Sequence, residues 1–244
     1  MNMKKIIKKL IRLISSPFII GDYQKFRQRS DQRFKISPCD FYPCLRDKTF
    51  KTSFDAHYVY HTAWAARKVR EINPERHTDI SSSLYFSGIV SAFVPVDFYD
   101  YRPADLNLSN LKSASADLTQ LFFADSSLSS LSCMHTVEHI GLGRYGDMID
   151  PAGDLKAMNE LKRVLAPGGS LLFVVPVGRP KIEYNAHRIY SFKMIREYFK
   201  ELTLKEFSLI DDTGKFIENA DPEKVKDQKY GCGCFWFIKQ SGIE

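Results

Sequence analysis

The fold of this chain is decided by residues 128–178, LSSLSCMHTVEHIGLGRYGDMIDPAGDLKAMNELKRVLAPGGSLLFVVPVG. Residues 131–137 are mostly apolar and predict a short buried strand, and polar residues and glycines follow it. Apolar residues then recur at helical spacing over 154–165, and the Pro-Gly-Gly run at 167–169 predicts a stop for that helix. Residues 170–177 are continuously apolar, which is typical of a strand buried on both faces. A strand, a helix and a second strand in succession predict a right-handed βαβ unit.

The carboxyl ends of these two strands are where the sequence predicts a ligand. In open α/β sheets, ligands bind in the crevice beyond those ends. Here the ends are residues 135–147 and 177–187, which contain histidine, glutamate, aspartate and arginine. The two loops belong to neighbouring strands, so their polar side chains are expected to converge on one site.

The helix-turn-strand part of the stretch resembles a known family. The run NELKRVLAPGG at 159–169 comes after TVEHI at 136–140. This succession resembles the passage from the fourth to the fifth strand of class I S-adenosylmethionine-dependent methyltransferases. The longer runs HTVEHIGLGRYGD at 135–147 and NAHRIYS at 185–191 resemble one bacterial branch of that fold, a domain of unknown function. The resemblance covers roughly residues 54–237.

The resemblance implies a Rossmann-like α/β fold. Its sheet is expected to have seven mostly parallel strands, with helices on both faces and an antiparallel pair of strands at the C-terminus. The sequence places an amphipathic helix over 191–200 and the two last strands over 202–210 and 230–239, joined by a polar loop. One fold hosts many functions, so this architecture implies little about the substrate.

The resemblance also implies S-adenosylmethionine as the cofactor. The first site along the chain where it is expected to contact the protein is the turn after the first strand. That strand is expected at 77–82. The family has an acidic, glycine-rich turn here, because the backbone must approach the cofactor closely. Asp79 matches the acid, but Ser81-Ser82-Ser83 stand where glycines usually do. This is the main departure from the family's pattern.

Two further acids are expected to contact the cofactor. The second strand is predicted at 94–99, and Asp100 at its end suits two hydrogen bonds to ribose hydroxyls. Residues 115–118 resemble the family's third-strand end, where an acid meets the adenine amine. The expected cofactor-binding residues are Asp79, Ser81, Ser83, Asp100, Asp117 and Leu118.

The expected reaction is a displacement at a methyl sulfonium, which needs a base when the acceptor is a hydroxyl. His187 is the first candidate for that base, because it lies on a loop and an imidazole titrates near neutral pH. His135 is the second. Glu138 and His139 have two interpretations, catalysis or bracing of the loop, since buried charges need partners. The candidate catalytic residues are therefore His187, His135, Glu138 and His139.

Arginines on the same loops suit an anionic substrate group such as a sugar phosphate. Arg144 and Arg188 are the candidates, and pairing with loop carboxylates such as Asp147 or Asp150 is the alternative. The expected substrate-binding residues are Arg144, Asp147, Arg188 and Tyr190.

Two other functions compete with methyl transfer. The pentad HTVEH at 135–139 matches H-x-x-E-H, a zinc-protease motif. That motif needs a helix to place both imidazoles on one face, whereas an apolar strand precedes the pentad and Gly141 and Gly143 follow it. A zinc hydrolase is therefore the second hypothesis. A non-catalytic relative that keeps the sheet as a scaffold is the third, supported by the serine-rich first turn.

No metal site is predicted from the remaining histidines and cysteines. An odd number of cysteines without an export signal indicates reduced thiols. Neither Cys39/Cys44 nor Cys232/Cys234 has the two-residue gap of a zinc motif. His57 and His61 are one turn apart in a helix predicted over 55–72, without an adjacent acid. That helix is expected to cover the cofactor or substrate pocket.

Positive charge is concentrated at the N-terminus. The net charge is +6, but residues 1–35 hold ten Lys/Arg and two Asp, which gives +8 and leaves −2 for the rest of the chain. A nearly neutral body is not typical of nucleic-acid binding. Residues 1–20 have an Ile/Leu face and a Lys/Arg face. Their apolar runs are too short to span a bilayer, and Arg12 interrupts the apolar core that a secretory signal needs.

A basic amphipathic helix lying on anionic lipid is the prediction for residues 1–20. Packing on the body or on the other subunit of a homodimer is the alternative. The expected organisation is a basic segment at 1–35, a cap loop and helix at 36–75, and a methyltransferase-like domain at 76–244. The chain is expected in the cytoplasm, at the inner face of the membrane, methylating a hydroxyl of a sugar or a lipid-linked glycan intermediate.

Overall fold

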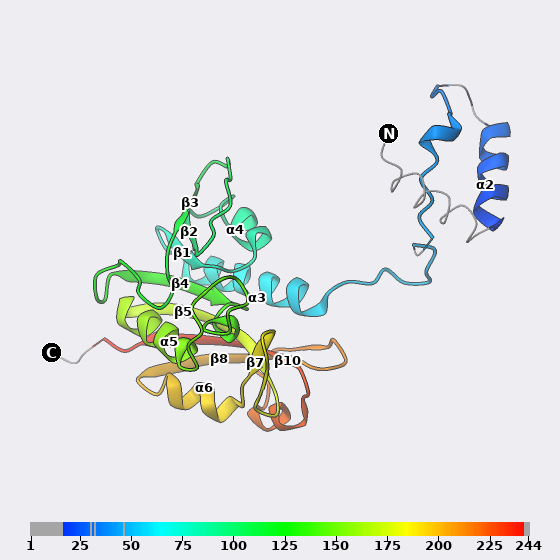
Figure 1. The fold of residues 1–244 in the computed structure, drawn as a ribbon. Helices are drawn as coiled ribbons and strands as arrows, with labels where there is room; N and C mark the ends of the chain where they lie inside the picture. Colours follow the sequence, from blue (N-terminus) through cyan, green and yellow to red (C-terminus); the bar gives the residue numbers. More distant parts are fainter. Residues whose placement is uncertain (1–16, 30, 32, 46, 242–244) are drawn as a thin grey trace. The chain divides into compact units, whose positions relative to one another are not determined.

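The computed structural model describes residues 17–29, 31, 33–45 and 47–241, and the chain forms two compact units, residues 1–53 and 54–244 (Figure 1). The first unit contains α2 (Pro17–Gln28) and a 3-10 turn (Pro38–Asp40). Most of the predicted lipid-binding helix, residues 1–16, lies outside the described residues. Among the helices that the structure describes, none has the length and apolar character needed to cross a membrane.

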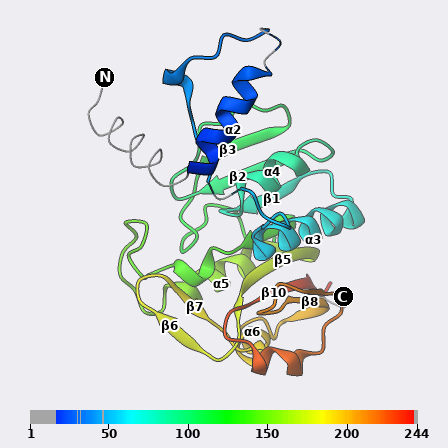
Figure 2. The ribbon, with the colours of Figure 1, turned by 90° about the vertical axis from the view of Figure 1, so that its right-hand side faces the viewer.

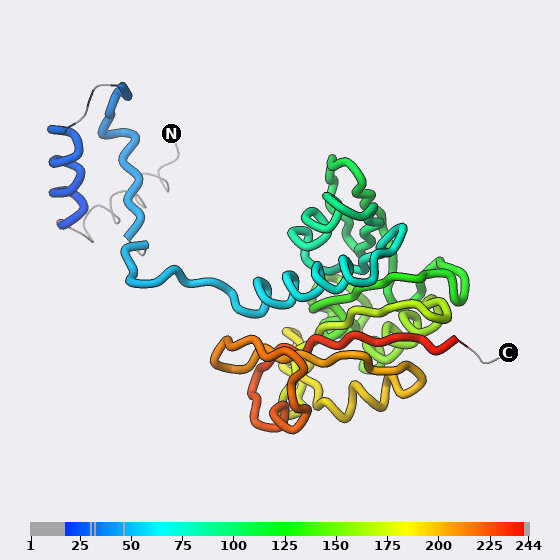
Figure 3. The backbone as a smooth tube through the Cα atoms, turned by 180° about the vertical axis from the view of Figure 1, so that it is seen from behind, coloured from blue at the N-terminus to red at the C-terminus, as the bar shows by residue number. Residues whose placement is uncertain are grey.

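The second unit is built on one eight-stranded sheet with the order β3-β2-β1-β4-β5-β10-β8-β9. Its strands are β1 (His77–Ile80), β2 (Val96–Asp100), β3 (Leu111–Ser115), β4 (Leu128–Met134), β5 (Leu165–Val177), β8 (Leu202–Ile210), β9 (Phe216–Ile217) and β10 (Gly231–Lys239). The first five strands pair in parallel, and β10 pairs antiparallel with both β5 and β8. In Figure 3 the red β10 lies between these two strands. The predicted Rossmann-like fold with a C-terminal antiparallel pair is confirmed.

The strand count differs from the predicted seven because of β9. This two-residue strand pairs with the end of β8, Leu209 opposite Ile217 and Ile210 opposite Phe216. The turn between them is closed by the Asp211 carboxylate, which accepts from the backbone N–H of Thr213 and Lys215 at 2.9 and 3.0 Å. Two paired residues inside a polar loop leave no alternating pattern for a sequence to show.

The strand β5 also begins earlier than predicted. It starts at Leu165, opposite Leu128, and the next pair is Ser130 opposite Ser170. The Pro-Gly-Gly run at 167–169 therefore bulges within the strand, where Gly168 has a φ of +74°. A proline and a left-handed glycine turn the chain here, as expected, but the turn lies inside β5 instead of before it.

Helices cover both faces of the sheet (Figure 2). On one face, α3 (Ala56–Ile72) and α4 (Leu84–Val90) contribute Trp64, Val69 and Phe86 to an apolar core. On the other face, α5 (Gly153–Val164) and α6 (Phe192–Tyr198) contribute Met158 and Ile195 to a second core. Two sheet faces that are both buried explain why the central strands read as continuous apolar runs.

The ends of α3 follow from local sequence. Asp55 is its N-cap, and its carboxylate accepts from the N–H of Tyr58 at 3.2 Å. Asn73 ends it in the left-handed conformation, with φ 50°, immediately before Pro74. A capping acid and a left-handed residue ahead of a proline are standard helix boundaries. The helix therefore starts and stops where the sequence predicts.

A two-stranded hairpin, β6 (Lys181–Glu183) and β7 (His187–Ile189), follows β5 and was not predicted. Its strands are three residues long and carry charged residues, so no hydrophobic period marks them. The connections from β2 to β3 and from β3 to β4 are loops. Both features leave side chains gathered at the carboxyl ends of the parallel strands.

Candidate functional site

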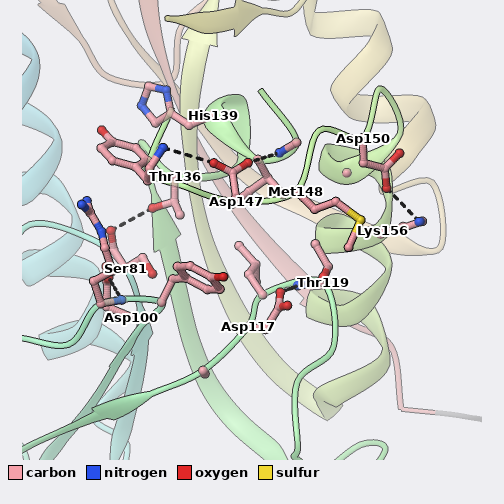
Figure 4. Close-up of a pocket in the computed structure, with 18 of the residues that line it drawn as sticks. Ser81, Asp100, Asp117, Thr119, Thr136, His139, Asp147, Met148, Asp150 and Lys156 are labelled. Atoms are coloured by element: carbon pink, nitrogen blue, oxygen red, sulfur yellow. Dashed lines mark hydrogen bonds and ion pairs between the residues drawn. The ribbon is translucent and has the colours of Figure 1, made fainter. Parts of the chain in front are cut away.

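A cavity of about 410 Å³ opens at the carboxyl ends of the parallel strands (Figure 4). Ser81 follows β1, Asp100 ends β2, Asp117 follows β3 and Thr136 follows β4, and all four line it. Strand β1 has β2 on one side and β4 on the other, so the chain order reverses at this point of the sheet. A crevice at such a reversal is where open α/β sheets bind their ligands.

The serine turn after β1 keeps the backbone conformation of a glycine turn. Ser81 has a φ of +56°, in the left-handed region that glycine favours. Its N–H donates to the Tyr99 carbonyl at 2.7 Å, and its own carbonyl accepts from Thr136 Oγ1 at 2.8 Å. These contacts hold a conformation that costs a serine about 1–2 kcal/mol. Ser81 therefore holds the left-handed conformation that was expected of a glycine at this turn.

The cavity gathers only part of the expected cofactor-binding set. Ser81, Asp100, Asp117 and Leu118 line it. Asp79 is fully buried inside the sheet, below the cavity. Ser83 is the N-cap residue of α4 and lines a separate groove between α3 and α4. The acid and the last serine of the turn therefore lie outside the cavity.

Asp79 belongs to a buried chain of polar side chains. Its carboxylate accepts from Ser87 Oγ and Ser132 Oγ, both at 2.5 Å. His77 Nε2 lies 2.9 Å from Ser132 Oγ, and its Nδ1 lies 2.8 Å from Ser130 Oγ. The single Ser132 proton goes to Asp79, so His77 must donate from Nε2 and accept at Nδ1. This fixes one tautomer of a neutral imidazole, in agreement with burial, which lowers the pKa of His77 to about 3.

The buried carboxyl of Asp79 predicts a pH dependence of stability. Burial raises its pKa from 3.8 to about 6, against the hydrogen bonds from the serines. The unfolded chain therefore loses this proton at a lower pH than the folded chain does. Its contribution to the free energy of unfolding falls as pH rises from about 4 to about 6, by roughly 3 kcal/mol, and is constant above.

Urea unfolding of the wild type and of Asp79→Asn at pH 4.5 and pH 7.5 tests this. Between pH 4.5 and pH 7.5 we expect the free energy of unfolding of the wild type to fall by about 2–3 kcal/mol relative to that of Asp79→Asn. Asp105→Asn, which changes an exposed carboxyl, serves as the control and is expected to follow the wild type. Parallel stability profiles for the wild type and Asp79→Asn would contradict the raised pKa.

The segment after β4 does not form the helix that a zinc-protease motif requires. His135 has a φ of +54°, and a single 3-10 turn follows (Val137–His139). Glu138 is 1% exposed, and its Oε1 lies 2.9 Å from His135 Nδ1 and 3.7 Å from His139 Nε2. The carboxylate therefore lies between the two imidazoles and braces the turn. This contact is the one that the bracing interpretation predicts for Glu138.

The contact between His135 and Glu138 is not a fully charged ion pair. Burial raises the pKa of Glu138 to about 7 and lowers the pKa of His135 to about 4. Both shifts disfavour a charged pair, because neither charge is hydrated in the interior. Near neutral pH the His135 Nδ1–H therefore donates to a carboxyl group whose own charge is only partly developed.

Two histidines, His135 and His139, line the cavity. His135 Nε2 lies 3.3 Å from Cys232 Sγ, whereas His139 Nε2 is available as an acceptor. The Nδ1 of His139 lies 2.6 Å from the Ala186 carbonyl, so this nitrogen donates and Nε2 carries the lone pair. Burial lowers the pKa of His139, and Glu138 opposes that shift. The neutral, proton-accepting form therefore dominates at neutral pH.

His187, the first candidate for a base from the sequence, lies on β7 beside the cavity and does not line it. Its ring packs against Tyr230 at 4.8 Å, and its Nε2 lies 3.4 Å from the Glu183 carboxylate. Its ring centroid lies 6.5 Å from that of His139. The unpredicted hairpin turns this side chain toward β6 and Tyr230.

Two expected substrate-binding residues are buried and hold the loops together. Arg188 donates to the Ile140 carbonyl at 2.6 Å and lies 3.6 Å from the Asp154 carboxylate. The Tyr190 hydroxyl donates to Asp154 at 2.9 Å. Because these groups are used within the protein, they anchor the loop after β4 to the start of α5. The sequence offered Asp147 or Asp150 as partners for the arginines, whereas the carboxylate beside Arg188 is that of Asp154.

The other two expected substrate-binding residues belong to the loop at 141–150. Asp147 lines the cavity and accepts from the N–H of Gly141 at 2.7 Å and of Tyr145 at 3.2 Å. Burial raises the pKa of Asp147, but these amides outweigh it and the pKa is lowered. Arg144 is exposed, lies over the Tyr145 ring at 5.1 Å and donates to Ala186 at 3.0 Å.

Several lining residues were not predicted. Thr119, Thr136, Tyr145 and Lys156 also line the cavity. Thr136 and Tyr145 lie within the quoted motif, so their position beyond β4 was the available signal. Lys156 reaches the cavity from α5 and lies 2.8 Å from Asp150. Its placement depends on how the 141–150 loop folds back, which no local pattern encodes.

The protein is similar to one family of unknown function. A family model described as "Caenorhabditis protein of unknown function, DUF268" matches residues 107–209. That description names Caenorhabditis, so the bacterial branch in the sequence resemblance stays a prediction. Comparison with curated protein sequences finds no match.

Solved methyltransferase structures share the fold. The N-methyltransferase NodS from Bradyrhizobium japonicum, in complex with S-adenosyl-L-homocysteine, matches 75% of this chain and 89% of its own, with 12% identity and a TM-score of 0.50. The complex of the Haloferax volcanii Trm112 methyltransferase activator with a candidate methyltransferase matches 78% and 92%, with 18% identity and a TM-score of 0.53. YcgJ from Bacillus subtilis matches 75% and 100%, with 13% identity and a TM-score of 0.55. Identities this low establish the fold alone.

Proposed function

We propose that this chain transfers a methyl group from S-adenosylmethionine to an acceptor bound beside His139. The observation that carries the proposal is the cavity at the reversal point of the sheet, where the ends of four parallel strands place Ser81, Asp100 and Asp117 together. Solved methyltransferases share the fold on which this arrangement occurs.

The residues present fit this cofactor. Asp100 ends β2, and its Oδ1 is oriented by the N–H of Arg102 at 2.7 Å, so the carboxylate suits the ribose hydroxyls. Asp117 and the buried Leu118 follow β3 and suit the amine and the flat face of adenine. The left-handed Ser81 turn keeps the backbone close to the cavity. When bound, S-adenosylmethionine would supply an electrophilic methyl group on a sulfonium.

The protein's own part in the reaction is to orient the acceptor and take its proton. His139 Nε2 is the atom assigned to accept that proton, in place of the His187 favoured by the sequence, because His139 lines the cavity and its Nδ1 donates to Ala186. Glu138, 3.7 Å from Nε2, would stabilise the imidazolium that forms. Water exclusion would depend on the 141–150 loop, which Asp147 closes.

The acceptor proposed from the sequence is a hydroxyl of a sugar or a lipid-linked glycan. The polar lining from Thr136, Asp147 and Lys156 is compatible with such a group. The membrane-surface contact that would favour a lipid-linked acceptor depends on residues outside the described chain. A sugar hydroxyl as the acceptor is therefore a narrower proposal, which depends on methyl transfer itself.

Isothermal titration of the purified full-length protein with S-adenosylmethionine and with S-adenosylhomocysteine tests the proposal. We expect one equivalent of each to bind. His139→Gln should bind both as the wild type does, because His139 is assigned to the acceptor and not to the cofactor. If the wild-type protein is folded and binds neither compound, methyl transfer is wrong and the scaffold hypothesis takes its place.

A further inference from the structure

Three side chains from separate elements converge beside the cavity: His57 from α3, His135 from the end of β4 and Cys232 from β10. One potential ligand atom of each lies within 4.8 Å of the other two. We propose that these residues form a binding site for a divalent transition-metal ion, Zn²⁺ by the chemistry of its ligands. The proposal goes beyond methyl transfer, and it assigns a metal to His57 and Cys232, for which the sequence predicted none.

The orientation of His135 supports a ligand role. Its Nδ1 donates to Glu138 at 2.9 Å, so Nε2 carries the lone pair, and Nε2 lies 3.3 Å from Cys232 Sγ. Metal-binding histidines usually donate their second nitrogen to a carboxylate or a carbonyl, which fixes the tautomer and the ring. His135 has a φ of +54°, outside the strand conformation of β4, and its ring centroid lies 5.8 Å from that of His57.

His61 provides an independent observation. It is fully buried, and its Nδ1 donates to the His57 carbonyl at 2.6 Å. Its Nε2 is buried and has no hydrogen-bond partner among the described residues. An unpaired polar atom in the interior costs about 1–3 kcal/mol unless something binds it. The His61 ring centroid lies 5.0 Å from that of His135, so His61 is a neighbour of the cluster, although it is not one of the three residues whose ligand atoms meet within 4.8 Å.

The ligand types select the metal. Imidazole nitrogen and thiolate sulfur suit Zn²⁺ and its neighbours in the transition series, whereas Mg²⁺ and Ca²⁺ prefer oxygen. Tetrahedral Zn²⁺ with bonds of about 2.0–2.3 Å holds its ligand atoms roughly 3.3–3.8 Å apart. Cys232 and His135 already meet that spacing at 3.3 Å. Small side-chain rotations would bring His57 within the same range.

The residues Cys232, His135 and Glu138 also form a thiol–imidazole–carboxyl arrangement. Such an arrangement is the geometry of a cysteine nucleophile. A nucleophile must reach its substrate. Cys232 is 0% exposed, so its sulfur is not accessible to a substrate. The His57 ring stacks on His135 at 5.8 Å and on Tyr230 at 5.3 Å, which covers the cluster. A closed site suits a bound ion and not a nucleophile.

The proposal is tested by titrating the chelator-treated, full-length protein with Co²⁺, the spectroscopic substitute for Zn²⁺, followed by competition with Zn²⁺. All proteins would carry Cys39→Ser and Cys44→Ser, which remove the exposed cysteines. We expect one equivalent of Co²⁺ with a thiolate-to-metal charge-transfer band. Cys232→Ala should abolish the band and weaken binding at least about 100-fold, and Glu138→Gln should weaken it about 10-fold or more.

Cys133→Ala is the matched control, since Cys133 is a buried cysteine that packs in the core on the other face of the sheet. It should keep the band and the affinity. Absence of stoichiometric binding by a folded protein, or a band that persists in Cys232→Ala, would overturn the proposal. Titration of Cys232→Ala with S-adenosylhomocysteine separates the two proposals, because loss of the metal site is expected to leave cofactor binding unchanged.

Discussion

Asp100→Ala is expected to weaken binding of S-adenosylhomocysteine by more than ten-fold. The carboxylate ends β2 at the wall of the cavity and is held by the amide of Arg102. In the proposed complex it accepts hydrogen bonds from two ribose hydroxyls. Each hydrogen bond to a charged group contributes about 1.5–3 kcal/mol, so loss of one already accounts for a ten-fold change. The measurement is calorimetric titration of both proteins under the same conditions.

The matched control is Asp105→Ala, which removes an exposed carboxylate from the loop that follows β2. It changes the net charge by the same amount, so equal losses in the two variants would indicate a general electrostatic effect. Asp100→Asn should show an intermediate loss, because the amide keeps the shape but not the charge. If Asp100→Ala binds as tightly as the wild type, the end of β2 is not the ribose site.

Arg188→Ala is expected to lower the free energy of unfolding by about 3–5 kcal/mol. Arg188 is 5% exposed, and its guanidinium donates to the Ile140 carbonyl at 2.6 Å and lies 3.6 Å from Asp154. Its removal leaves the buried Asp154 carboxylate with only the Tyr190 hydroxyl as a partner among the described side chains. An uncompensated buried charge costs more than the pair contributed. Urea unfolding at neutral pH measures the change.

Lys156→Ala provides the comparison, because its ion pair with Asp150 is largely exposed, with 61% of the lysine side chain accessible. Exposed pairs contribute at most about 1 kcal/mol, so this variant should unfold close to the wild type. Replacing Arg188 by methionine together with Asp154→Leu should recover much of the stability, since both charges are then removed. A loss below about 1 kcal/mol in Arg188→Ala would contradict the anchoring role.

The sequence predicts those parts of the fold that depend on long, buried periodic segments. Strand β8 and helix α3 fall within one residue of their predicted bounds, because their burial pattern and caps are local. The hairpin β6–β7 escapes prediction because three-residue strands of charged residues have no measurable period. Its position depends on long-range packing against β5 and the loop after β4.

The same distinction applies within the candidate site. Asp100 and Asp117 could be predicted to line it because each follows a strand whose end faces the crevice. Asp79 could not be excluded from it by sequence, because its inward direction depends on the serines of β4 and α4 that bind it. His57, His135 and Cys232 meet only through packing of α3, β4 and β10, and no spacing within the chain indicates that.

The polar chain inside the sheet has a consequence for how the two central strands are aligned. Asp79 pairs with Ser132 in the β1–β4 ladder, and the same two residues share a buried hydrogen bond. A one-residue slip would turn Ser130 and Ser132 to the opposite face, which would leave the buried His77 without these partners and Asp79 with Ser87 but without Ser132. The strands are thus locked in register from within. Ser81 and His135 directly follow those strands and line the cavity, so the buried hydrogen bonds that fix the register also fix where these two residues lie. We therefore expect positions 77, 79, 87, 130 and 132 to vary together among relatives.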